Sequence, residues 1–374
     1  MNFPKMTVPG KPRRLQLDFV RGIAILMVMA GHFRLPHTGT PLDWFEDLAE
    51  RFGGQGVNLF FVLSGFLVGG LLLKEYQDTG KIEPGRFLLR RMFKIWPGYY
   101  FLILVHAVTR HHPLSTFFWQ NVLNLQNYLG SSLKQTWTLA IEEHFYIVLA
   151  FLLAYVASRK WPARRILTLS VTICFLAFLS RTITAVLGNY EGASQWTQNR
   201  IDSLLFGVIL ALLYSMMPAV YSRMSARVVP LVAAIVVGAL CVVFDDNPVL
   251  YFGPGLVAIY IAAGAFLLLV NEHSGRLTEW WLYRSISWVG IYSYALYLWH
   301  SSVLGLGEKI IARYPAGIAW PLSLSVQFFG ALAIAFVATH VIEWPFLKWR
   351  ESIPGLRDSR PLGSLGSPQM KALL

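Results

Sequence analysis

Three ionisable side chains interrupt an apolar run near the start of the chain. Asp18, Arg21 and His32 lie within LDFVRGIAILMVMAGH, residues 17–32. At about 100° per residue, residues 21 and 32 share one helix face, about 16 Å apart along its axis. Imidazole can accept and return a proton near neutral pH, and a guanidinium suits a phosphate. The stripe indicates a donor molecule with its anionic head near Arg21 and its reactive end near His32. The alternative is structural, with Asp18 pairing with Arg21 and His32 closing a hydrogen-bond network.

A second group of cations begins a later apolar run. Arg90, Arg91 and Lys94 belong to RRMFKIWPGYY, residues 90–100. Arg91 and Lys94 are three residues apart and share a helix face. Such a cluster can simply anchor a helix at the cytoplasmic surface, and it can also hold the phosphates of a nucleotide.

Two adjacent carboxylates enter a third apolar run. Glu142 and Glu143 lie in WTLAIEEHFY, residues 137–146. Carboxylates next to an apolar helix are costly unless they are paired or solvated. One of them could neutralise Arg200 or support His32 as its charged partner. One of the two also fits a simpler role, as the acid at a helix N-terminus.

Other polar residues enter the apolar runs singly. Arg200 and Asp202 stand at the entrance of a helix, where they either pair with each other or meet an acceptor molecule. Asn58 follows a glycine-rich stretch and is expected to line the interior. Glu343 lies near the end of the last apolar run. His300, alone in its run, is interpreted as a satisfied core residue.

Composition places these groups in a membrane protein. Of the 374 residues, 55% are hydrophobic and 14% are charged, whereas soluble proteins carry about a quarter charged residues. Runs long enough to cross a bilayer recur along the chain. The sequence therefore predicts an all-α integral membrane protein, a polytopic bundle formed by residues 1–350, with a flexible cytoplasmic tail at 351–374. About ten spans are expected, at residues 15–34, 54–73, 87–109, 137–157, 165–187, 201–217, 228–244, 249–270, 286–306 and 319–343.

The charge distribution orients the bundle. Most of the 32 Lys and Arg residues fall in segments that are cytoplasmic if the N-terminus is inside, which favours two cytoplasmic termini in the inner membrane. The same bias accounts for most of the net charge of +12 without a nucleic-acid partner. Cys174 and Cys241 lie in apolar runs, so a disulfide is not expected. No spacing of metal ligands is recognised.

Taken in order, these segments resemble the membrane acyltransferase 3 family, bacterial enzymes that acylate sugars and related acceptors. The resemblance runs from about residue 14 to 350. It rests on LDFVRGIAILMVMAGH, GVNLFFVLSGFLV, RRMFKIWPGYY, WTLAIEEHFY, RIDSLLFGV, SYALYLWH and IEWPF.

The resemblance implies roles for particular residues. The family's Arg–His spacing falls on Arg21 and His32, and its paired basic motif falls on Arg91 and Lys94, where the family more often has a second arginine. Its Trp–Glu–Glu–Tyr pattern and its late glutamate fall on Trp137, Glu142, Glu143, Tyr146 and Glu343. Here His144 replaces the common glutamine. Some relatives carry an additional extracytoplasmic hydrolase-like domain; we expect this chain to act without one.

The predicted reaction is O-acyl transfer, most simply of acetyl, from acyl-coenzyme A to a hydroxyl of a carbohydrate or glycosylated acceptor. His32 would act as general base or acyl carrier, oriented by Glu142 or Glu143, and no metal is required. The coenzyme is expected at Arg21, Arg90, Arg91, Lys94 and Trp137, and the acceptor at Asn58, Arg200, Asp202 and Glu343. The hypothesis requires a continuous, protein-lined passage from the basic residues to His32.

Three other functions remain open. One is a secondary transporter, which also places charges at the membrane midplane. Another is a lipid-linked sugar transferase that uses Asp245, or Glu46 and Asp47. The last is a catalytically silent membrane scaffold.

Overall fold

The described part of the protein is predominantly helical. The structure, a computed structural model, describes residues 15–109, 114–227, 231–232, 235–236, 239 and 247–356. No strand occurs in these residues. The expected span at 228–244 falls largely outside them, as do Cys241, Asp245 and the tail from residue 357.

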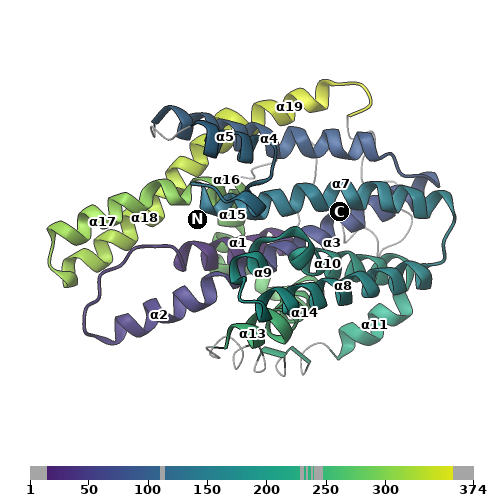
Figure 1. The fold of residues 1–374 in the computed structure, drawn as a ribbon, viewed down its shortest axis with the longest axis horizontal. Coiled ribbons are helices and arrows are strands. Elements are labelled where there is room, and N and C mark those ends of the chain that lie inside the picture. The colour runs from purple at the N-terminus through teal and green to yellow at the C-terminus, as the bar shows by residue number, and fades with distance from the viewer. Residues whose placement is uncertain are drawn as a thin grey trace.

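Most long helices run roughly along the longest axis of the molecule (Figure 1). The helices of the first half are α1 (Leu15–Ala30), α2 (Pro41–Gly53), α3 (Gln55–Thr79), α4 (Pro84–Thr109), α5 (Leu114–Val122), α6 (Gln126–Leu129), the 3₁₀ turn η1 (Lys134–Thr136), α7 (Trp137–Ser158) and α8 (Ala163–Val186). Those of the second half are α9 (Tyr190–Gln195), α10 (Thr197–Met216), α11 (Pro218–Ala226), α13 (Pro248–Leu250), η2 (Tyr251–Gly255), α14 (Leu256–His273), η3 (Gly275–Glu279), α15 (Trp281–Ile291), α16 (Ser293–Trp299), η4 (His300–Val303), α17 (Leu304–Arg313), α18 (Ala316–Ala338), η5 (Thr339–Glu343) and α19 (Trp344–Ser352).

Six helical segments in the described residues are long and apolar enough to cross a membrane. They are Pro41–Thr79, Lys134–Ser158, Ala163–Val186, Tyr190–Met216, Pro248–Glu272 and Ala316–Ser352. Their length and composition agree with a membrane protein.

Two regions differ from the helices expected from hydropathy. The apolar run at 286–306 is a broken rod: α15 ends at Ile291, α16 follows, and a 3₁₀ turn leads into α17. Hydropathy does not record such breaks, because every segment stays apolar. The other difference is α2, a helix with polar and apolar faces that begins with Thr40 as its N-cap and Pro41 in its first turn. Such a helix suits a surface better than a bilayer interior.

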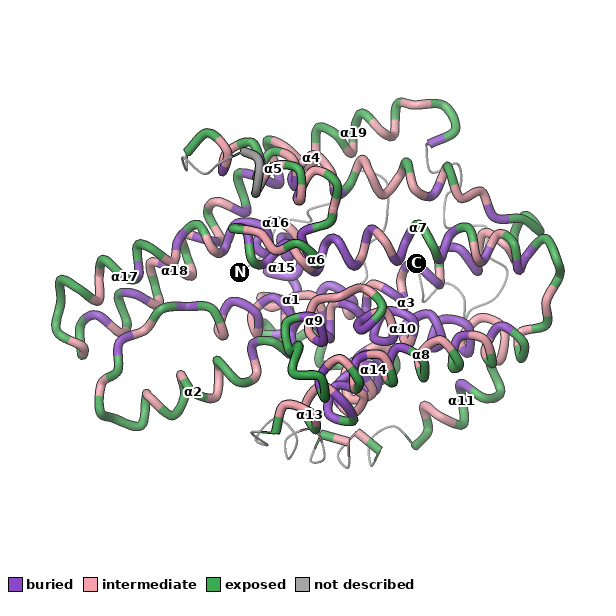
Figure 2. Tube along the Cα trace, in the orientation of Figure 1, coloured by how far each residue is buried: buried purple, intermediate pink, exposed green. Residues whose placement is uncertain are grey.

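The centre of the bundle is built on close helix contacts. Gly65 of α3 lies against the backbone of Leu204 on α10, and Gly207 of α10 lies against the backbone of Val62 on α3. A Cβ atom at either glycine would overlap a carbonyl oxygen, so only glycine allows these backbones to meet. Figure 2 shows buried residues concentrated along α1, α3 and α10.

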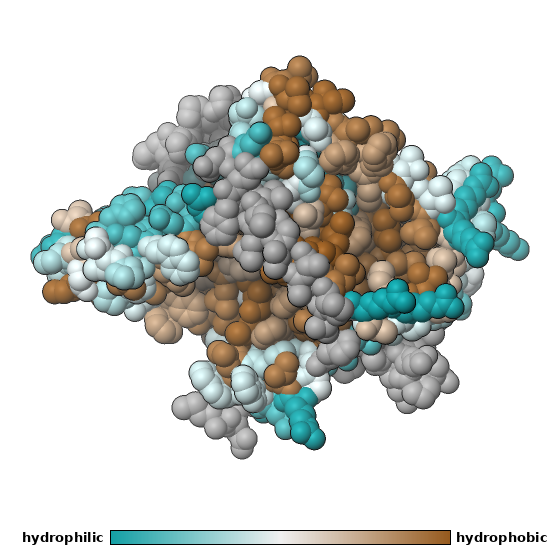
Figure 3. All heavy atoms as spheres, turned by 90° about the horizontal axis from the view of Figure 1, so that it is seen from below, coloured by the Kyte–Doolittle hydropathy of each residue, from teal (hydrophilic) through white to brown (hydrophobic). Residues whose placement is uncertain are grey.

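The rim of the bundle presents apolar side chains to its surroundings. On α8 the exposed residues include Phe175, Leu176 and Ile183, and on α18 they include Phe329 and Val337. In the face drawn in Figure 3, hydrophobic side chains fill much of the middle and hydrophilic ones lie mainly toward the edges. A surface of this kind is expected where helices contact lipid.

Candidate active site

A cavity of about 140 Å³ gathers most of the expected donor-binding residues; we call it the basic cavity. Its polar walls come from five helices, α1, α3, α4, α7 and α16. They include Arg21, Ser64, Arg91, Lys94, Glu142 and Tyr146. Three cations and one carboxylate therefore face a common space, which favours an anionic occupant.

Contacts inside the basic cavity hold these groups in place. Arg21 donates a hydrogen bond from Nη1 to Oδ1 of Asp18 at 2.7 Å. The guanidinium of Arg91 lies over the ring of Tyr146, 4.5 Å from its centroid, and its Nε has no hydrogen-bond partner. The Tyr146 hydroxyl is bonded to the hydroxyl of Ser64. Arg91 is thus fixed by an aromatic ring while it keeps donor capacity for a ligand.

The expected site residues Arg90, Glu143 and Glu343 do not line this cavity. Arg90 donates from Nη1 to the carbonyl oxygen of Leu356 at 2.9 Å. Glu143 is buried and accepts from Nε1 of Trp96 at 3.4 Å. Glu343 accepts from Thr339 at 3.3 Å and lies close enough to Lys94 for their charges to interact. Glu343, expected beside the acceptor, therefore lies near the basic cavity instead.

His32 lines a separate cavity of about 250 Å³, which we call the histidine cavity. Its polar and aromatic walls include His32, Asn58, Gln135, Trp137, Ser194 and Arg200. Trp137, expected with the donor, belongs here. The cavity provides what the sequence required of His32, a protein-lined space in place of lipid.

The backbone fixes the tautomer of His32. Its Nδ1 lies 2.7 Å from the carbonyl oxygen of Val28. A carbonyl can only accept, so Nδ1 carries the proton and Nε2 of the neutral ring has a free lone pair. His32 follows the end of α1 at Ala30; the residue is exposed and lines the histidine cavity. The ring is therefore prepared to take a proton at Nε2.

The aromatic neighbour of His32 is His300, which the sequence analysis interpreted as a core residue. The ring of His300 lies 5.1 Å from the ring of His32, in an edge-to-face arrangement. His300 is fully buried; its Nδ1 lies 2.9 Å from the carbonyl oxygen of Tyr297, and its Nε2 has no partner. The prediction that His300 is a satisfied core residue is therefore right about its burial, but it misses the nitrogen without a partner. The expected support from Glu142 is absent, because that side chain faces the basic cavity.

The two cavities share two wall residues, Val57 and Tyr297. The Tyr297 hydroxyl donates to the carbonyl oxygen of Gln135 at 2.8 Å and lies 2.6 Å from the hydroxyl of Thr138. The expected continuous passage corresponds to two adjoining cavities that share these two wall residues. Tyr297 and His300 are three positions apart and therefore lie on the same face of a helix. This spacing is the sequence signal that could have identified both as site residues.

Arg200 and Asp202 do not pair with each other. Arg200 faces the histidine cavity and donates from Nη2 to Oδ1 of Asn58 at 2.7 Å. Asp202 lies 2.6 Å from Nη1 of Arg181, and both side chains are fully buried. Asp202 lines neither cavity, because two residues along a helix turn the side chain to a different face. Its expected contact with an acceptor is not supported by this position.

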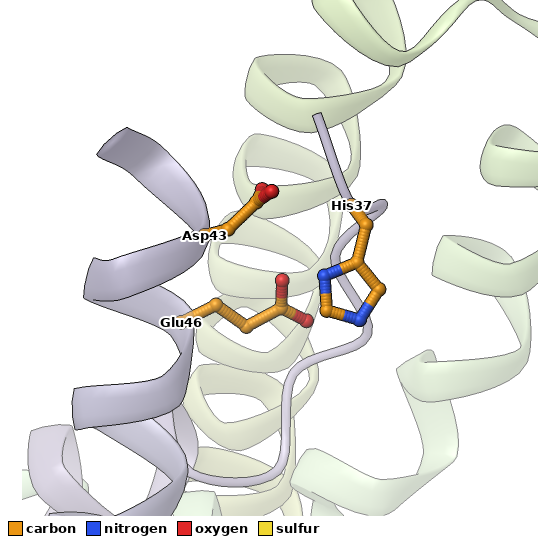
Figure 4. A group of neighbouring side chains, drawn as sticks. All are labelled: His37, Asp43 and Glu46. Atoms are coloured by element: carbon orange, nitrogen blue, oxygen red, sulfur yellow. The ribbon is translucent and has the colours of Figure 1, made fainter. Parts of the chain in front are cut away.

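One group of potential metal ligands lies outside both cavities. His37, Asp43 and Glu46 each offer an atom within 4.8 Å of the others, and Figure 4 shows Glu46 and His37 pointing toward one another. The chain reversal between α1 and α2 brings them together, which their spacing in the sequence did not indicate. Asp43 already accepts from the backbone of Thr38 at 2.7 Å and of Gly39 at 2.8 Å, so it serves first to hold this loop.

The chain is similar to proteins named as O-acetyltransferases. It is 27% identical to the peptidoglycan O-acetyltransferase OatA of Listeria monocytogenes, over 89% of this chain and 55% of the relative. It is 28% identical to the putative peptidoglycan O-acetyltransferase YrhL of Bacillus subtilis, over 88% and 54%. A putative O-acetyltransferase of Staphylococcus aureus is 27% identical over 90% and 59%.

The chain therefore spans little more than half the length of these curated relatives. No solved structure matches it. The family described as an acyltransferase domain matches residues 14–340, a stretch that contains α1 through α18 and every residue of the two cavities. With that match across most of its length, the chain belongs to the membrane acyltransferase 3 family.

Proposed function

We propose that the protein is an O-acyltransferase that moves an acyl group, most simply acetyl, from acyl-coenzyme A to a hydroxyl of a carbohydrate. The observation that carries this proposal is the placement of a cation-rich cavity and a histidine cavity on either side of one wall, Val57 and Tyr297. An anionic donor and a hydroxyl acceptor can then approach the wall from opposite sides.

The basic cavity suits the donor in charge. Arg21, Arg91 and Lys94 would supply positive charge for its phosphates. The cavity, of about 140 Å³, is too small for the whole coenzyme, so the adenosine would lie outside it and the narrow thioester arm would extend into the protein. Glu142 and Tyr146 would position the arm.

The acceptor hydroxyl would enter the histidine cavity. His32 would take its proton at Nε2, since Nδ1 is held by Val28. Trp137 and Asn58 offer an aromatic face and an amide, both suited to a sugar. The names of two relatives make a peptidoglycan glycan the first acceptor to test.

The proposal places the protein in the inner membrane as a multi-pass protein of about ten helices with both termini in the cytoplasm. Under that orientation the basic cavity faces the cytoplasm, where acyl-coenzyme A is made. Residues 351–374 would form a cytoplasmic tail. The acceptor would then be a glycan of the cell envelope.

The test uses the full chain, purified in detergent and supplied with labelled acetyl-coenzyme A and glycan fragments. Mass spectrometry should detect a new O-acetyl ester and free coenzyme A in equal amounts. His32→Ala should lower ester formation by about 100-fold or more while the protein stays folded. Full activity in the His32→Ala protein would remove the role given to His32. Substrate flux without ester formation would favour a transporter, and glycosyl transfer independent of coenzyme A would favour a sugar transferase.

A further inference from the structure

Arg200 is a buried cation in the histidine cavity. Only 4% of the residue is exposed, yet it lines the same cavity as His32. Burying a guanidinium removes it from water, which is unfavourable unless a counter-charge compensates. The identity of that counter-charge is therefore the question that this side chain raises.

The side chains in direct contact with the guanidinium of Arg200 are neutral. Its Nη2 donates to Oδ1 of Asn58 at 2.7 Å, and Nδ2 of Asn58 donates to Gln55 at 2.9 Å. Gln55 in turn donates to the hydroxyl of Tyr251 at 3.1 Å. This series of hydrogen bonds fixes the position of Arg200 and does not neutralise its charge.

No acid in the described residues forms an ion pair with Arg200, although the charge of Asp202 acts on it from a distance. The carboxylate two positions away, Asp202, lies 2.6 Å from Arg181, and no aspartate or glutamate is among the described residues that line the cavity. The rings of Phe61 and Trp137 lie 5.7 and 5.8 Å from the guanidinium carbon. Attraction to their faces offsets only part of the cost of burying a charge. The Nε atom of Arg200 is also buried without a partner.

We propose that Arg200 binds an anionic oxygen in the histidine cavity during turnover. The proposal rests on the proposed acyl transfer and adds a requirement to it. Two sources supply this chemistry. One is a carboxylate carried by the sugar acceptor, which would make the acceptor an acidic carbohydrate. The other is the oxyanion that forms on the acyl carbon.

The second source follows from the reaction itself. The acceptor hydroxyl gives its proton to Nε2 of His32 as its oxygen bonds to the acyl carbon, and the carbonyl π electrons move onto the carbonyl oxygen. That oxygen is the anion. When the pair returns, the carbon–sulfur bond breaks and the thiolate takes the proton from His32. The products are an ester and a free thiol, so atoms and charge balance.

The experiment compares Arg200→Gln and Arg200→Lys with the exposed control Arg313→Gln in the purified full chain. Two acceptors are used, a neutral hexoside and the uronic acid of the same sugar. If Arg200 holds an acceptor carboxylate, Arg200→Gln raises KM for the uronic acid about tenfold or more and leaves the neutral hexoside unchanged. If Arg200 holds the oxyanion, kcat falls by a similar factor for both acceptors while KM stays constant.

Arg200→Lys keeps the charge and should lose less than Arg200→Gln in either case, whereas the control should match the wild type. Thermal unfolding with added uronic acid provides a measurement that needs no turnover. If the uronic acid stabilises the wild type, and this stabilisation is lost in Arg200→Gln or reduced in Arg200→Lys, the anion site is supported even without acyl transfer. A lack of acyl transfer in that case would defeat only the proposed function. Unchanged kcat and KM in folded Arg200 variants, with no stabilisation of the wild type, would overturn the inference.

Discussion

The rings of His32 and His300 meet edge to face, with their planes at 72°. Each ring directs Nδ1 toward a backbone carbonyl, that of Val28 for His32 and that of Tyr297 for His300. Both rings therefore present Nε2 as the unprotonated nitrogen when neutral. His32 follows the end of its helix, so the buried ring of His300 is a fixed surface against which it can rest.

His300→Phe should show whether His300 orients the His32 ring or only stabilises the fold. Phenylalanine keeps an aromatic ring beside His32 and removes a buried nitrogen that has no partner, so the melting temperature should hold or rise. The changed edge should leave His32 less well oriented, and kcat should fall about tenfold with KM unchanged. His300→Ala should lower kcat further because it leaves a void. Steady-state kinetics and thermal unfolding check this; full kcat in His300→Phe would show that His32 does not depend on it.

Arg91→Ala should weaken donor binding more than Arg90→Ala. Arg91 lines the basic cavity, whereas Arg90 donates to the carbonyl of Leu356. Losing a charge-assisted contact to a phosphate should raise the KM for acyl-coenzyme A about tenfold or more. The comparison is made as KM against salt concentration, where the wild type should lose affinity with salt and Arg91→Ala should lose less. Equal effects of the two alanines would contradict the placement of the donor.

Lys94→Arg tests the departure from the family pattern. Lys94 lines the same cavity as Arg91, and a second guanidinium would offer a planar pair of donors in place of a point charge. The KM for acyl-coenzyme A should stay equal or fall, while Lys94→Ala should raise it. A strong loss in Lys94→Arg would mean that the shape of the ammonium, and not only its charge, is required.

Val57→Trp should thicken the wall between the two cavities. Val57 lines both of them, and a larger side chain there thickens the wall without altering Arg91 or His32. Transfer should fall more than about tenfold, allowing for overpacking that costs about 1–3 kcal/mol of stability. Binding of acyl-coenzyme A should persist, as measured by calorimetry. Val57→Ile is the matched control and should stay near the wild-type rate; loss of donor binding in Val57→Trp would indicate general damage instead.

Asp202→Ala should destabilise the fold rather than weaken acceptor binding. Removing Asp202 leaves Arg181 charged and fully buried, which costs about 3–5 kcal/mol of the free energy of unfolding. The double variant Arg181→Met with Asp202→Leu removes both charges and should recover much of that loss. Thermal unfolding measures both, and the protein that remains folded should keep its KM for the acceptor. A raised KM for the acceptor with normal stability would instead indicate that Asp202 contacts the acceptor.

The sequence identified which polar side chains face the interior, but it predicted few of the residues that they contact. Helical arithmetic correctly joins Asp18 to Arg21, because that pair lies within one turn. It fails to join Arg21 to His32 in one space, since α1 ends at Ala30 and the two residues line different cavities. The ion pair of Arg181 with Asp202 joins two helices, and nothing in the spacing of one chain segment records such a pairing.

The apolar runs show the same limit. Hydropathy locates α7, α8 and α10 nearly at their bounds, because each is an unbroken apolar helix. It joins α15 to α16 across Tyr292, where the backbone leaves the helical conformation. The residues on both sides are largely apolar, so hydropathy carries no sign of the break.

The wall formed by Val57 and Tyr297 bears on how an idle enzyme would treat its donor. Under the proposed function the cations hold the phosphates and the thioester lies at the wall, so water entering beside His32 would reach the thioester only past these two side chains. Hydrolysis of an idle donor would thereby be slowed, and the metabolic cost of keeping such an enzyme loaded between acceptors would stay low.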